Sequence, residues 1–485
     1  MSLQINAVFC SKAPGRGYGL YPAPHFPELS ACTEVTTSLI ALRSLFMQAG
    51  LDSVNQGLPN WNPLGAIVRA GDKVVIKPNW VHHCNGSGHG LDCLVTHTSV
   101  IEAILLYVAK ASPQSIIVCD APIQSCDFEA LMAACGVSEM MQRITANKVE
   151  AVIKDLRRTI RRGETLSGKV QEDCRSMENY ILFDLRSDSL LEAITHEESE
   201  FRVTMYHPDS LKRTHSLGRH QYLVARDVIE ADVVINVPKL KTHKKACLTG
   251  ALKNMVGING HKEYLPHHRK GGSGNGGDCY PGRSLVKSLV EEVLEAANRA
   301  RGPVVRPVLA ATVRAAMALG KVVGVDNNYE GSWRGNDTVW RMCLDLQRVL
   351  HHGLLDGTLS DQVQRKVLTI TDAIVAGEGD GPLSPTPLDL GMMTFAMNPA
   401  ASDWVHAILM GLTPEGIPLT REAFRHYRYP LTDFSPEDIV VHVDGLPVQC
   451  GELFARYGHP FRLPSGWDQG VNRSRKISET VGESA

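Results

Sequence analysis

Three short apolar runs, each ended by a polar residue or a proline, constrain the fold more than any other feature of this sequence. They read DKVVIKPNW at 72–80, SIIVCDAP at 115–122 and ADVVINVP at 231–238. A helical pattern, THTSVIEAILLYVAK, lies between the first two runs, and DFEALMAACG follows the second. Apolar strands that alternate with helices predict βαβ units. We therefore expect an α/β fold with a mainly parallel sheet and flanking helices.

Further periodic segments extend this pattern along the chain. Strands are expected at 5–10, 179–185, 321–326, 366–382, 392–399 and 438–448, and helices at 284–300, 336–350 and 401–411. The helix at 284–300 has an apolar face that includes Leu285 and Leu289. Thr96 or Thr98 is the expected N-cap of the helix before the second run, and Asn336 that of the helix at 336–350. We expect Gly136 to end the short helix after the second run.

These patterns divide the chain into four segments. Residues 1–142 form an N-terminal α/β half, and residues 143–220, which are polar with poor periodicity, form an insertion or flap. Residues 221–411 form a second α/β half that carries the basic and acidic motifs described below. Residues 412–485 form a C-terminal extension, and we expect its polar end to fray.

Positive charge is concentrated directly after the third apolar run. Between Asn236 and Lys270 the only acid is Glu263, and the basic residues are Lys239, Lys241, Lys244, Lys245, Lys253, Lys262, Arg269 and Lys270. Open α/β sheets bind ligands at the carboxyl ends of their strands. A helix expected from about Thr249 would add free N–H groups. We interpret this segment as a site for a carboxylate, phosphate or sulfate group, and a basic surface loop is the alternative.

Acidic residues dominate a later part of the chain. Residues 326–403 contain eleven Asp or Glu and five Lys or Arg. Asp372 lies near an expected strand end, and Glu378 and Asp380 lie in the glycine-rich turn GEGDGP. Carboxylates on a tight turn suit a hard cation such as Mg²⁺ or Ca²⁺. Ordinary turn chemistry is the alternative, since Asp and Gly favour turns in any case.

Three motifs in order resemble the signature segments of the domain-of-unknown-function 362 family. They are VVIKPNW, VINVPKLKTHKKACLTGALKNMVG and ITDAIVAGEGDGP followed by NPAASDWVHAILMG, so the resemblance spans roughly residues 72–411. It implies an α/β fold and supplies no reaction. A shorter resemblance relates the spacing of His243, Gly250 and Lys253 to the lactate racemase family, in which a lysine holds a nickel-pincer cofactor.

Carried onto this chain, the family resemblance implies twelve functional residues. They are Lys77, Asn79, Asp120, Lys239, Lys241, His243, Lys253, Asn254, Asp372, Glu378, Asp380 and Asp403. Many members of the family carry a ferredoxin-like cluster segment or an export signal. We find neither here, so we expect no iron–sulfur cluster.

Other features of the sequence narrow the function classes. The loop HHCNGSGHG offers His82, His83 and His89 for a transition metal or for acid–base steps, and an exposed histidine-rich loop is the alternative. Motifs of P-loop NTPases, serine hydrolases and zinc proteases do not occur. The twelve cysteines form no CxxC pair, and the formal net charge is -2. We therefore expect reduced thiols, no nucleic-acid partner, no membrane span and a cytoplasmic location.

We conclude that the sequence favours an enzyme of unassigned reaction that acts on an anionic small molecule. Lys239, Lys241 and Lys253 would neutralise the anionic group, and His243 would act as an acid or base. Asp372, Glu378, Asp380 and Asp403 would hold Mg²⁺ or another divalent cation. Lys77, Asn79, Asp120 and Asn254 would line the same cleft. The alternatives are a carrier protein for an anionic metabolite or cofactor, and a racemase-like or redox enzyme with a bound cofactor. The sequence is compatible with a homo-oligomer and does not specify one.

Overall fold

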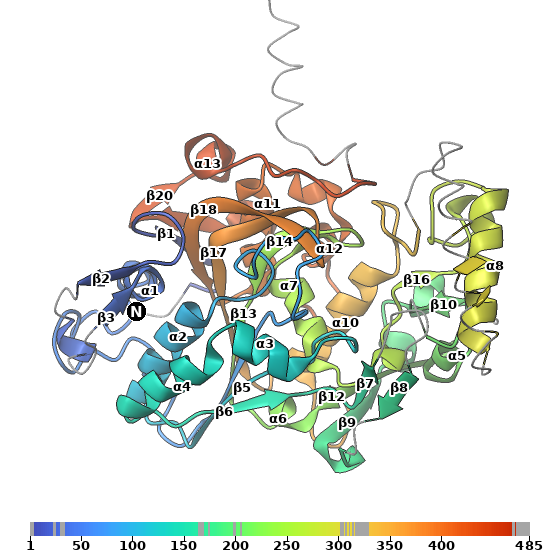
Figure 1. Ribbon diagram of the computed structural model, residues 1–485. Helices are drawn as coiled ribbons and strands as arrows, with labels where there is room; N and C mark the ends of the chain where they lie inside the picture. The colour runs from blue at the N-terminus through green and yellow to red at the C-terminus, as the bar shows by residue number, and fades with distance from the viewer. Residues whose placement is uncertain are drawn as a thin grey trace, which may run out of the picture.

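A computed structural model describes residues 4–22, 26–29, 34–162, 169–172, 175–196, 200–203, 206–300, 329–467 and 471, together with 305, 308–309, 311–312 and 315. A large sheet forms its centre (Figure 1). The strands of this sheet are β1 (Ala7–Lys12), β4 (Lys73–Pro78), β5 (Ser115–Asp120), β6 (Val152–Asp155), β13 (Val233–Val237), β14 (Lys239–His243), β15 (Cys247–Thr249), β17 (Lys366–Asp380), β18 (Ser384–Ala396), β19 (Val440–Val443) and β20 (Leu446–Val448). Its main path has the order β20-β19-β1-β18-β17-β13-β4-β5-β6, and β14 joins it by pairing with β17.

The sheet is mainly parallel, as the sequence predicts. Five consecutive strands, β17, β13, β4, β5 and β6, run parallel to one another. β18 is antiparallel to both β17 and β1. In the parallel half, Val234 lies opposite Val75 on one side and Val367 on the other. All five residues of β13 are buried. This burial explains the unbroken apolar run, since a parallel strand covered on both faces needs no polar alternation.

Helices cover both faces of the central sheet. They are α1 (Thr37–Gln48), α2 (Thr98–Lys110), α3 (Phe128–Ala134), α4 (Val137–Ala146), α6 (Arg226–Ile229), α7 (Ala251–Asn254), α10 (Val339–His352), α11 (Pro399–Leu409), α12 (Pro418–Glu422) and α13 (Cys450–Tyr457). Val233 and Ile235 belong to one apolar cluster with residues of α1 and α2. Val234 belongs to a second cluster with residues of α7 and α10. The period-two alternation of a strand thus divides the core into two layers.

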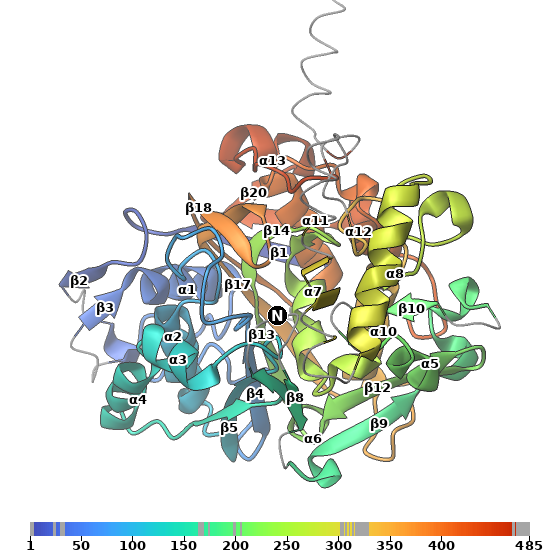
Figure 2. The ribbon, with the colours of Figure 1, turned by 45° about the vertical axis from the view of Figure 1, so that its right-hand side comes forward.

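A smaller lobe stands beside the central sheet, with α8 (Leu285–Arg299) at the right-hand edge of Figure 1 and in front of the lobe in Figure 2. Its other elements are β7 (Thr159–Arg162), β8 (Lys169–Glu172), β9 (Tyr180–Asp184), β10 (Phe201–Arg202), α5 (Ser210–Thr214), β11 (His215–Ser216), β12 (Arg219–Ala225) and β16 (His268–Arg269). β9, β12 and β11 form one antiparallel sheet, and β10 pairs with β16. A further short pair, β2 (Leu20–Pro22) with β3 (Glu34–Thr36), lies near α1.

The predicted segments share elements of the central sheet. β6 lies within 143–220, yet it pairs with β5 of the N-terminal half. β19 and β20 lie within the predicted C-terminal extension, and β19 pairs with β1 at the start of the chain. The expected strand at 321–326 and the expected fraying at the end of the chain lie outside the described residues. None of the described helices is long and apolar enough to cross a membrane.

Several predicted element boundaries are wrong for local reasons. His97, and not Thr96 or Thr98, caps α2, because its side chain accepts a hydrogen bond from the Ser99 N–H. α10 begins at Val339. Asn336 lies outside the helix, and its Oδ1 accepts a hydrogen bond from the Val339 N–H. The short helix after the second run is α3, and it does not end at Gly136. Its C-cap is the residue before Gly136, and Gly136 directly precedes α4.

Two further predicted elements differ in extent. The single strand expected at 438–448 is a hairpin of β19 and β20, because Asp444 and Gly445 both have positive φ, as the tight turn of a hairpin requires. The predicted apolar face of α8 is buried only in part: Val290 and Ala297 are buried. Leu285 is 91% exposed and Leu289 is 62% exposed, whereas the acids Glu291 and Glu295 are buried.

Asp345 of α10 ties the smaller lobe to the core. Its carboxylate accepts hydrogen bonds from Ser189 Oγ at 2.5 Å, Leu190 N at 3.0 Å and Tyr222 Oη at 3.0 Å, and it pairs with Arg348 at 3.0 Å. Asp345 and Arg348 are both buried. One carboxylate therefore holds groups from the lobe and from α10 together.

Asp345→Ala should lower the free energy of unfolding by about 3–5 kcal/mol, because it leaves the buried Arg348 guanidinium without its partner. Urea denaturation followed by circular dichroism measures this change. Asp361→Ala is the matched control, since Asp361 is exposed, and it should stay within about 0.5 kcal/mol of the parent. Equal stability of the two variants would contradict the role given to Asp345.

Candidate functional site

The carboxyl ends of the parallel strands open into one cavity of about 540 Å³. β4 contributes Lys77 and the residues after it, β5 contributes Asp120, and β14 contributes Lys241 and His243. Adjacent parallel strands bring their ends to one edge of a sheet, which is where ligands bind in folds of this class. Lys253 of the basic segment and Asp380 of the glycine-rich turn both line this cavity.

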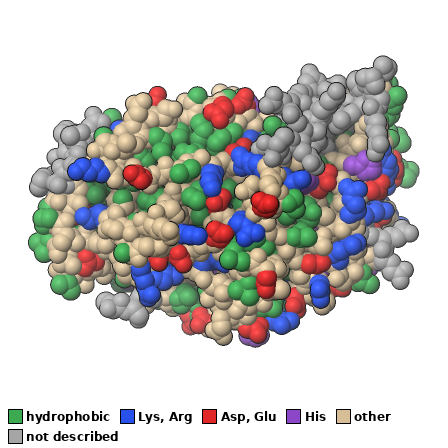
Figure 3. All heavy atoms as spheres, turned by 90° about the horizontal axis from the view of Figure 1, so that it is seen from below, with side chains coloured by type: hydrophobic (Ala, Val, Ile, Leu, Met, Phe, Trp, Pro, Cys, Tyr) green, Lys and Arg blue, Asp and Glu red, His purple; other side chains and the backbone are tan. Residues whose placement is uncertain are grey.

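The lining of this cavity is strongly basic. Its charged and imidazole side chains are Lys77, Lys241, Lys244, Lys245, Lys253, Lys262, His243, His267, Asp120, Glu330 and Asp380. On the outer face seen from below, acidic and basic side chains are interspersed (Figure 3). The excess of lysines in the cavity is therefore a local feature of the strand ends and does not extend over that face.

A buried ion pair forms one wall of the cavity. Lys77 Nζ lies 2.8 Å from Asp120 Oδ1, and the two side chains are 1% and 4% exposed. Burial lowers the pKa of Lys77, and the charge of Asp120 opposes this shift. Burial raises the pKa of Asp120, and the charge of Lys77 opposes that shift. The Trp80 N–H also donates to Asp120 Oδ2 at 2.7 Å. The pair is therefore fixed from both strands that carry it.

Asn254, the last residue of α7, connects this ion pair to the next strand. Its Oδ1 accepts from Lys77 Nζ at 2.9 Å and from Asn79 Nδ2 at 3.0 Å. Its Nδ2 donates to Asn236 Oδ1 at 2.8 Å and to the Lys77 carbonyl at 3.2 Å. Every hydrogen-bonding position of this amide is thus used. Asn254 positions Lys77 and Asn79 against β13.

Gly257 lets the chain after α7 pass directly over the ion pair. A Cβ atom at this position would lie 2.0 Å from Asp120 Oδ1 and 2.6 Å from Lys77 Nζ. No side chain fits there unless the pair moves. The glycine in the motif ALKNMVG therefore has a steric reason in this structure.

The remaining lysines raise the positive potential of the cavity. Burial lowers the pKa of Lys253, and burial together with the charge of Lys253 lowers the pKa of Lys262 to about 7. Burial and the neighbouring Lys239 lower the pKa of Lys241 well below its usual range. The Lys241 ammonium donates to the Leu94 carbonyl. An anion among these groups would favour their charged forms.

His243 is buried and neutral at physiological pH. Its Nδ1 accepts hydrogen bonds from Lys245 N at 3.0 Å and Ala246 N at 3.2 Å. In a neutral imidazole the other nitrogen then carries the proton. Burial and the charges of Lys253 and Lys245 hold the pKa of His243 well below its usual range. The ring therefore offers an Nε2–H donor, and an additional proton is strongly disfavoured.

Lys239 does not line the cavity, in contrast to its predicted role. Its ammonium lies 2.6 Å from Asp372 Oδ2 and donates to Tyr18 Oη at 2.6 Å. Tyr18 also donates to Asp372 Oδ1 at 2.6 Å, and its ring stacks on His97 with centroids 3.7 Å apart. Lys239 and Asp372 are both fully buried. This pair holds the N-terminal loop against β14 and β17.

Asp403 occupies the helix N-terminus that we expected to receive an anion. Its two oxygens accept from Ala251 N at 2.6 Å and Leu252 N at 2.9 Å. A Cβ atom on Gly250 would lie 2.0 Å from Asp403 Oδ1, so the carboxylate sits tightly against the start of α7. The helix begins at Ala251, two residues later than predicted, because 247–249 pair with β14. The anion bound at this terminus is the protein's own side chain.

The four carboxylates expected to hold a divalent cation are not brought together. Asp372 and Asp403 have the partners just described, and Glu378 accepts from Arg462 N at 2.8 Å. Asp380 lines the cavity at the end of β17 and lies 3.7 Å from the exposed Lys244 ammonium. Metal binding at the glycine-rich turn stays a prediction, and these four residues provide no pre-formed ligand set.

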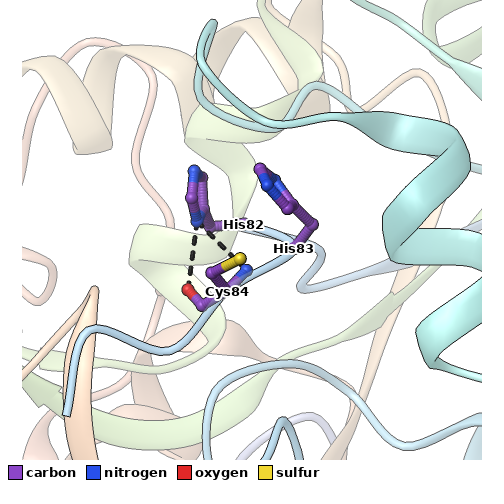
Figure 4. A group of neighbouring side chains, drawn as sticks. All are labelled: His82, His83 and Cys84. Atoms are coloured by element: carbon purple, nitrogen blue, oxygen red, sulfur yellow. Dashed lines mark hydrogen bonds between the residues drawn. The ribbon is translucent and has the colours of Figure 1, made fainter. Parts of the chain in front are cut away.

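The histidine-rich loop contains a compact His82, His83 and Cys84 group (Figure 4). His82 Nδ1 faces the backbone of Cys84, and Cys84 itself is exposed. His83 Nδ1 accepts a hydrogen bond from Asp127 N at 3.0 Å. His89 is exposed elsewhere on the loop. The loop is thus a hydrogen-bonded turn, and of its three histidines only His82 and His83 are partly buried.

Sequence reasoning missed several residues of the cavity. Lys244, Lys245 and Lys262 lie in the basic segment, but without the fold nothing separates them from Lys239, which points elsewhere. His267 lies in the same segment, and Glu330 comes from a distant part of the chain. For Glu330 the sequence carried no signal beyond its membership of an acidic region.

Comparison with known proteins gives three matches. The model of a family described as a domain of unknown function, DUF362, matches residues 74–179 and 191–407. The thylakoid-associated protein sll1697 of Synechocystis sp. is 26% identical over 222 residues, which make up 45% of this chain and 50% of that protein. The chain thus spans about half the length of this relative. A crystal structure of a protein from Thermotoga maritima aligns with 70% of this chain and 52% of that chain, at 10% identity and a TM-score of 0.29.

Gly257→Ala should lower the free energy of unfolding by about 1–3 kcal/mol, because the new methyl group displaces the buried ion pair. Gly451→Ala is the matched control, since a Cβ atom there meets nothing within 4 Å on the exposed surface of α13. Its stability should be unchanged or slightly higher, because alanine favours a helix more than glycine does. Urea denaturation of both variants measures the difference, and equal stabilities would contradict the close packing over the pair.

Lys262→Met should flatten the pH dependence of stability above neutrality. The pKa of Lys262 is about 7 in the folded protein, below the ordinary 10.5 that we take for the unfolded chain. Between these values the unfolded state binds the proton and the folded state does not, so this lysine makes stability rise with pH. The variant should therefore exceed the parent in stability at pH 7, and the excess should shrink as the pH approaches 10.

Urea midpoints in phosphate-free buffer at several pH values check this prediction. Lys212→Met removes an exposed lysine instead and should follow the parent. Parallel pH profiles for the Lys262 variant and the parent would show that Lys262 is protonated as usual.

Proposed function

The chain belongs to the DUF362 family, described as a domain of unknown function, and we propose that it is an enzyme that binds an anionic small molecule in the cavity at the strand ends. The anionic group is a carboxylate or a phosphate. The observation that carries the proposal is the imbalance of charge in the lining. Six lysines face three acids, and one of these acids, Asp120, is already paired with Lys77.

This imbalance has an energetic cost that an anion would offset. Ammonium groups removed from water are destabilised unless they are paired. The lowered pKa values of Lys241, Lys253 and Lys262 reflect this cost. A bound carboxylate or phosphate would restore the pairing, and its own charge would be stabilised by several donors at once.

Unpaired polar atoms in the lining support a polar ligand. Asn79 Oδ1, Trp80 Nε1 and Thr249 Oγ1 are buried and have no hydrogen-bond partner among the described residues, and all three residues line the cavity. Buried polar groups in proteins almost always have a partner, so three exceptions around one cavity point to a ligand or ordered water there. The volume of about 540 Å³ suits a metabolite-sized molecule.

Two groups are suited to chemistry on such a ligand. Lys262, with a pKa of about 7, can give or take a proton near neutrality. His243 offers its Nε2–H as a fixed donor to a developing negative charge. In this proposal Lys253 and Lys241 hold the anionic group. Asp380 is the one predicted metal ligand in position to meet a divalent cation that arrives with the anion.

The cysteines and the net charge bear on the proposed location and partners of the protein. We place it in the cytoplasm, which fits the ten described cysteines, all of them free thiols. Its formal net charge of -2 gives no general attraction to nucleic acid. A carrier protein without turnover is the alternative, and the experiment below separates it from an enzyme.

Lys253→Met should weaken anion binding at least about tenfold, because it removes one charge-assisted interaction of about 1.5–3 kcal/mol. Calorimetric titration of the parent with inorganic phosphate, pyrophosphate and a set of mono- and dicarboxylates measures the affinity. Lys212→Met, which removes an exposed lysine outside the cavity, should bind as the parent does. The affinity should also fall as the salt concentration rises.

Two outcomes would contradict the proposal. Absence of saturable binding for every anion tested would remove the anion site. Equal affinity of the Lys253 variant and the parent would place binding elsewhere. Product analysis with each ligand that binds then separates catalysis from carriage, and loss of turnover in Lys262→Met with retained binding would support the acid–base role.

A further inference from the structure

His268, Cys279 and Glu291 form a buried cluster of three metal-ligand types in the smaller lobe. They come from three separate segments, namely strand β16, the loop after it and helix α8. One ring nitrogen of His268, Cys279 Sγ and a carboxylate oxygen of Glu291 all lie within 4.8 Å of one another. The side chains are 5%, 3% and 7% exposed. The fold thus brings together residues that are eleven and twelve positions apart in sequence.

Glu291 has no ion-pair partner within the described residues, and the charge of Lys270, which pairs with Glu292 and Glu295, acts on it only from a longer distance. Its neighbour on the helix, Glu295, pairs with Arg202 at 2.5 Å and with Lys270 at 3.4 Å. The described residues place no basic side chain within ion-pair distance of Glu291. Yet α8 turns this acid inward while Leu285 and Leu289 remain exposed. Burying a carboxylate without a cation is energetically unfavourable, so the position of Glu291 favours a bound cation.

His268 has a ring nitrogen that no described residue uses in hydrogen bonding. Its Nδ1 is buried and has no hydrogen-bond partner in the described part of the chain. A small cavity of about 30 Å³ is lined in part by His268, Glu291 and Glu330. That volume holds one or two water-sized groups.

Backbone groups hold the other two side chains in place. The Gly271 N–H donates to the two oxygens of Glu291 at 3.1 and 3.0 Å. The Glu330 N–H donates to Cys279 Sγ at 3.3 Å. Donors of this kind orient metal ligands and stabilise a bound thiolate in metal sites. The cluster therefore has both ligand atoms and outer partners.

We propose that His268, Cys279 and Glu291 bind one divalent transition-metal ion of the zinc type. The mixture of sulfur, nitrogen and oxygen ligands suits Zn²⁺ better than Mg²⁺ or Ca²⁺, which prefer oxygen alone. On binding, the Cys279 thiol loses its proton to solvent, and the thiolate and the Glu291 carboxylate together neutralise the ion. Three protein ligands leave a fourth tetrahedral position, and the small cavity provides room for a water molecule there.

The ion would cross-link the lobe beside the anion cavity. β16, the following loop and α8 have no continuous sheet to join them, and the three ligands fix all three segments to one point. Glu330 lines both the small cavity and the large one, so the two sites are neighbours. The proposal does not depend on anion binding, because none of the three ligands lines the large cavity.

The His82, His83 and Cys84 group is a weaker candidate. His83 Nδ1 already accepts the Asp127 N–H, so in a neutral ring its other nitrogen carries a proton and cannot ligate. His82 and Cys84 also bond to each other through the backbone of this turn. This loop therefore supplies the matched control for the test, since it also contains histidine and cysteine ligands but no buried site.

Titration of the full chain, stripped of metal with a chelator, with Co²⁺ and Zn²⁺ tests the proposal. We expect one equivalent of Co²⁺ to bind with the visible d–d bands of a four-coordinate ion and a near-ultraviolet thiolate charge-transfer band. Zn²⁺ should displace it. Cys279→Ser and His268→Gln should each weaken binding at least about 100-fold, more than the 10–100-fold typical of losing an outer-shell partner. Cys84→Ser should bind as the parent does.

Several results would overturn the site. They are the lack of saturable binding at one equivalent, a spectrum without the thiolate band, or unchanged affinity in Cys279→Ser. Binding lost in Cys84→Ser would assign the metal to the other loop. Circular dichroism and urea midpoints verify that each variant folds. If Cys279→Ser does not fold, Glu291→Gln keeps the test open, since it preserves shape and should still weaken binding strongly.

Discussion

The ion pair between Lys77 and Asp120 is the interaction on which the rest of the site depends. Two neighbouring parallel strands each end in one of these charges, and burial makes either charge unfavourable without the other. Asn254 then orients Lys77, and Gly257 leaves the space that the pair needs. The path of the chain after β15 is therefore adapted to a pair of charges formed by β4 and β5. The other lysines are added around this fixed point.

The cavity shows a conflict between stability and binding. Lys241, Lys253 and Lys262 are held where burial and mutual repulsion lower their pKa values. Such groups reduce the stability of the folded protein at neutral pH, because the unfolded chain binds their protons more tightly. The same arrangement leaves several donors ready for an anion without the cost of reorganising them. Groups with strongly shifted pKa values in a cleft are typical of functional sites.

Several charged residues that look functional in the sequence hold the fold instead. Lys239 and Asp372 neutralise each other under Tyr18, and Asp403 caps α7 with its carboxylate. These residues prevent the start of α7 from serving as an anion site and fix the strand end on the other side. Conversely, Glu291 is an acid on a helix face that the sequence pattern assigned to solvent. Its burial beside His268 and Cys279 is what distinguishes the second site.

The sequence by itself determined the α/β class, the mainly parallel sheet and the segment that carries the cavity lysines. These follow from local patterns, namely apolar runs that end in polar residues and a concentration of lysines after one of them. Only the tertiary structure decided which charges are paired. Lys239 and Lys241 are two residues apart on one strand, yet one meets Asp372 and the other meets the cavity. Local spacing does not encode that difference, because the partners come from positions more than a hundred residues away.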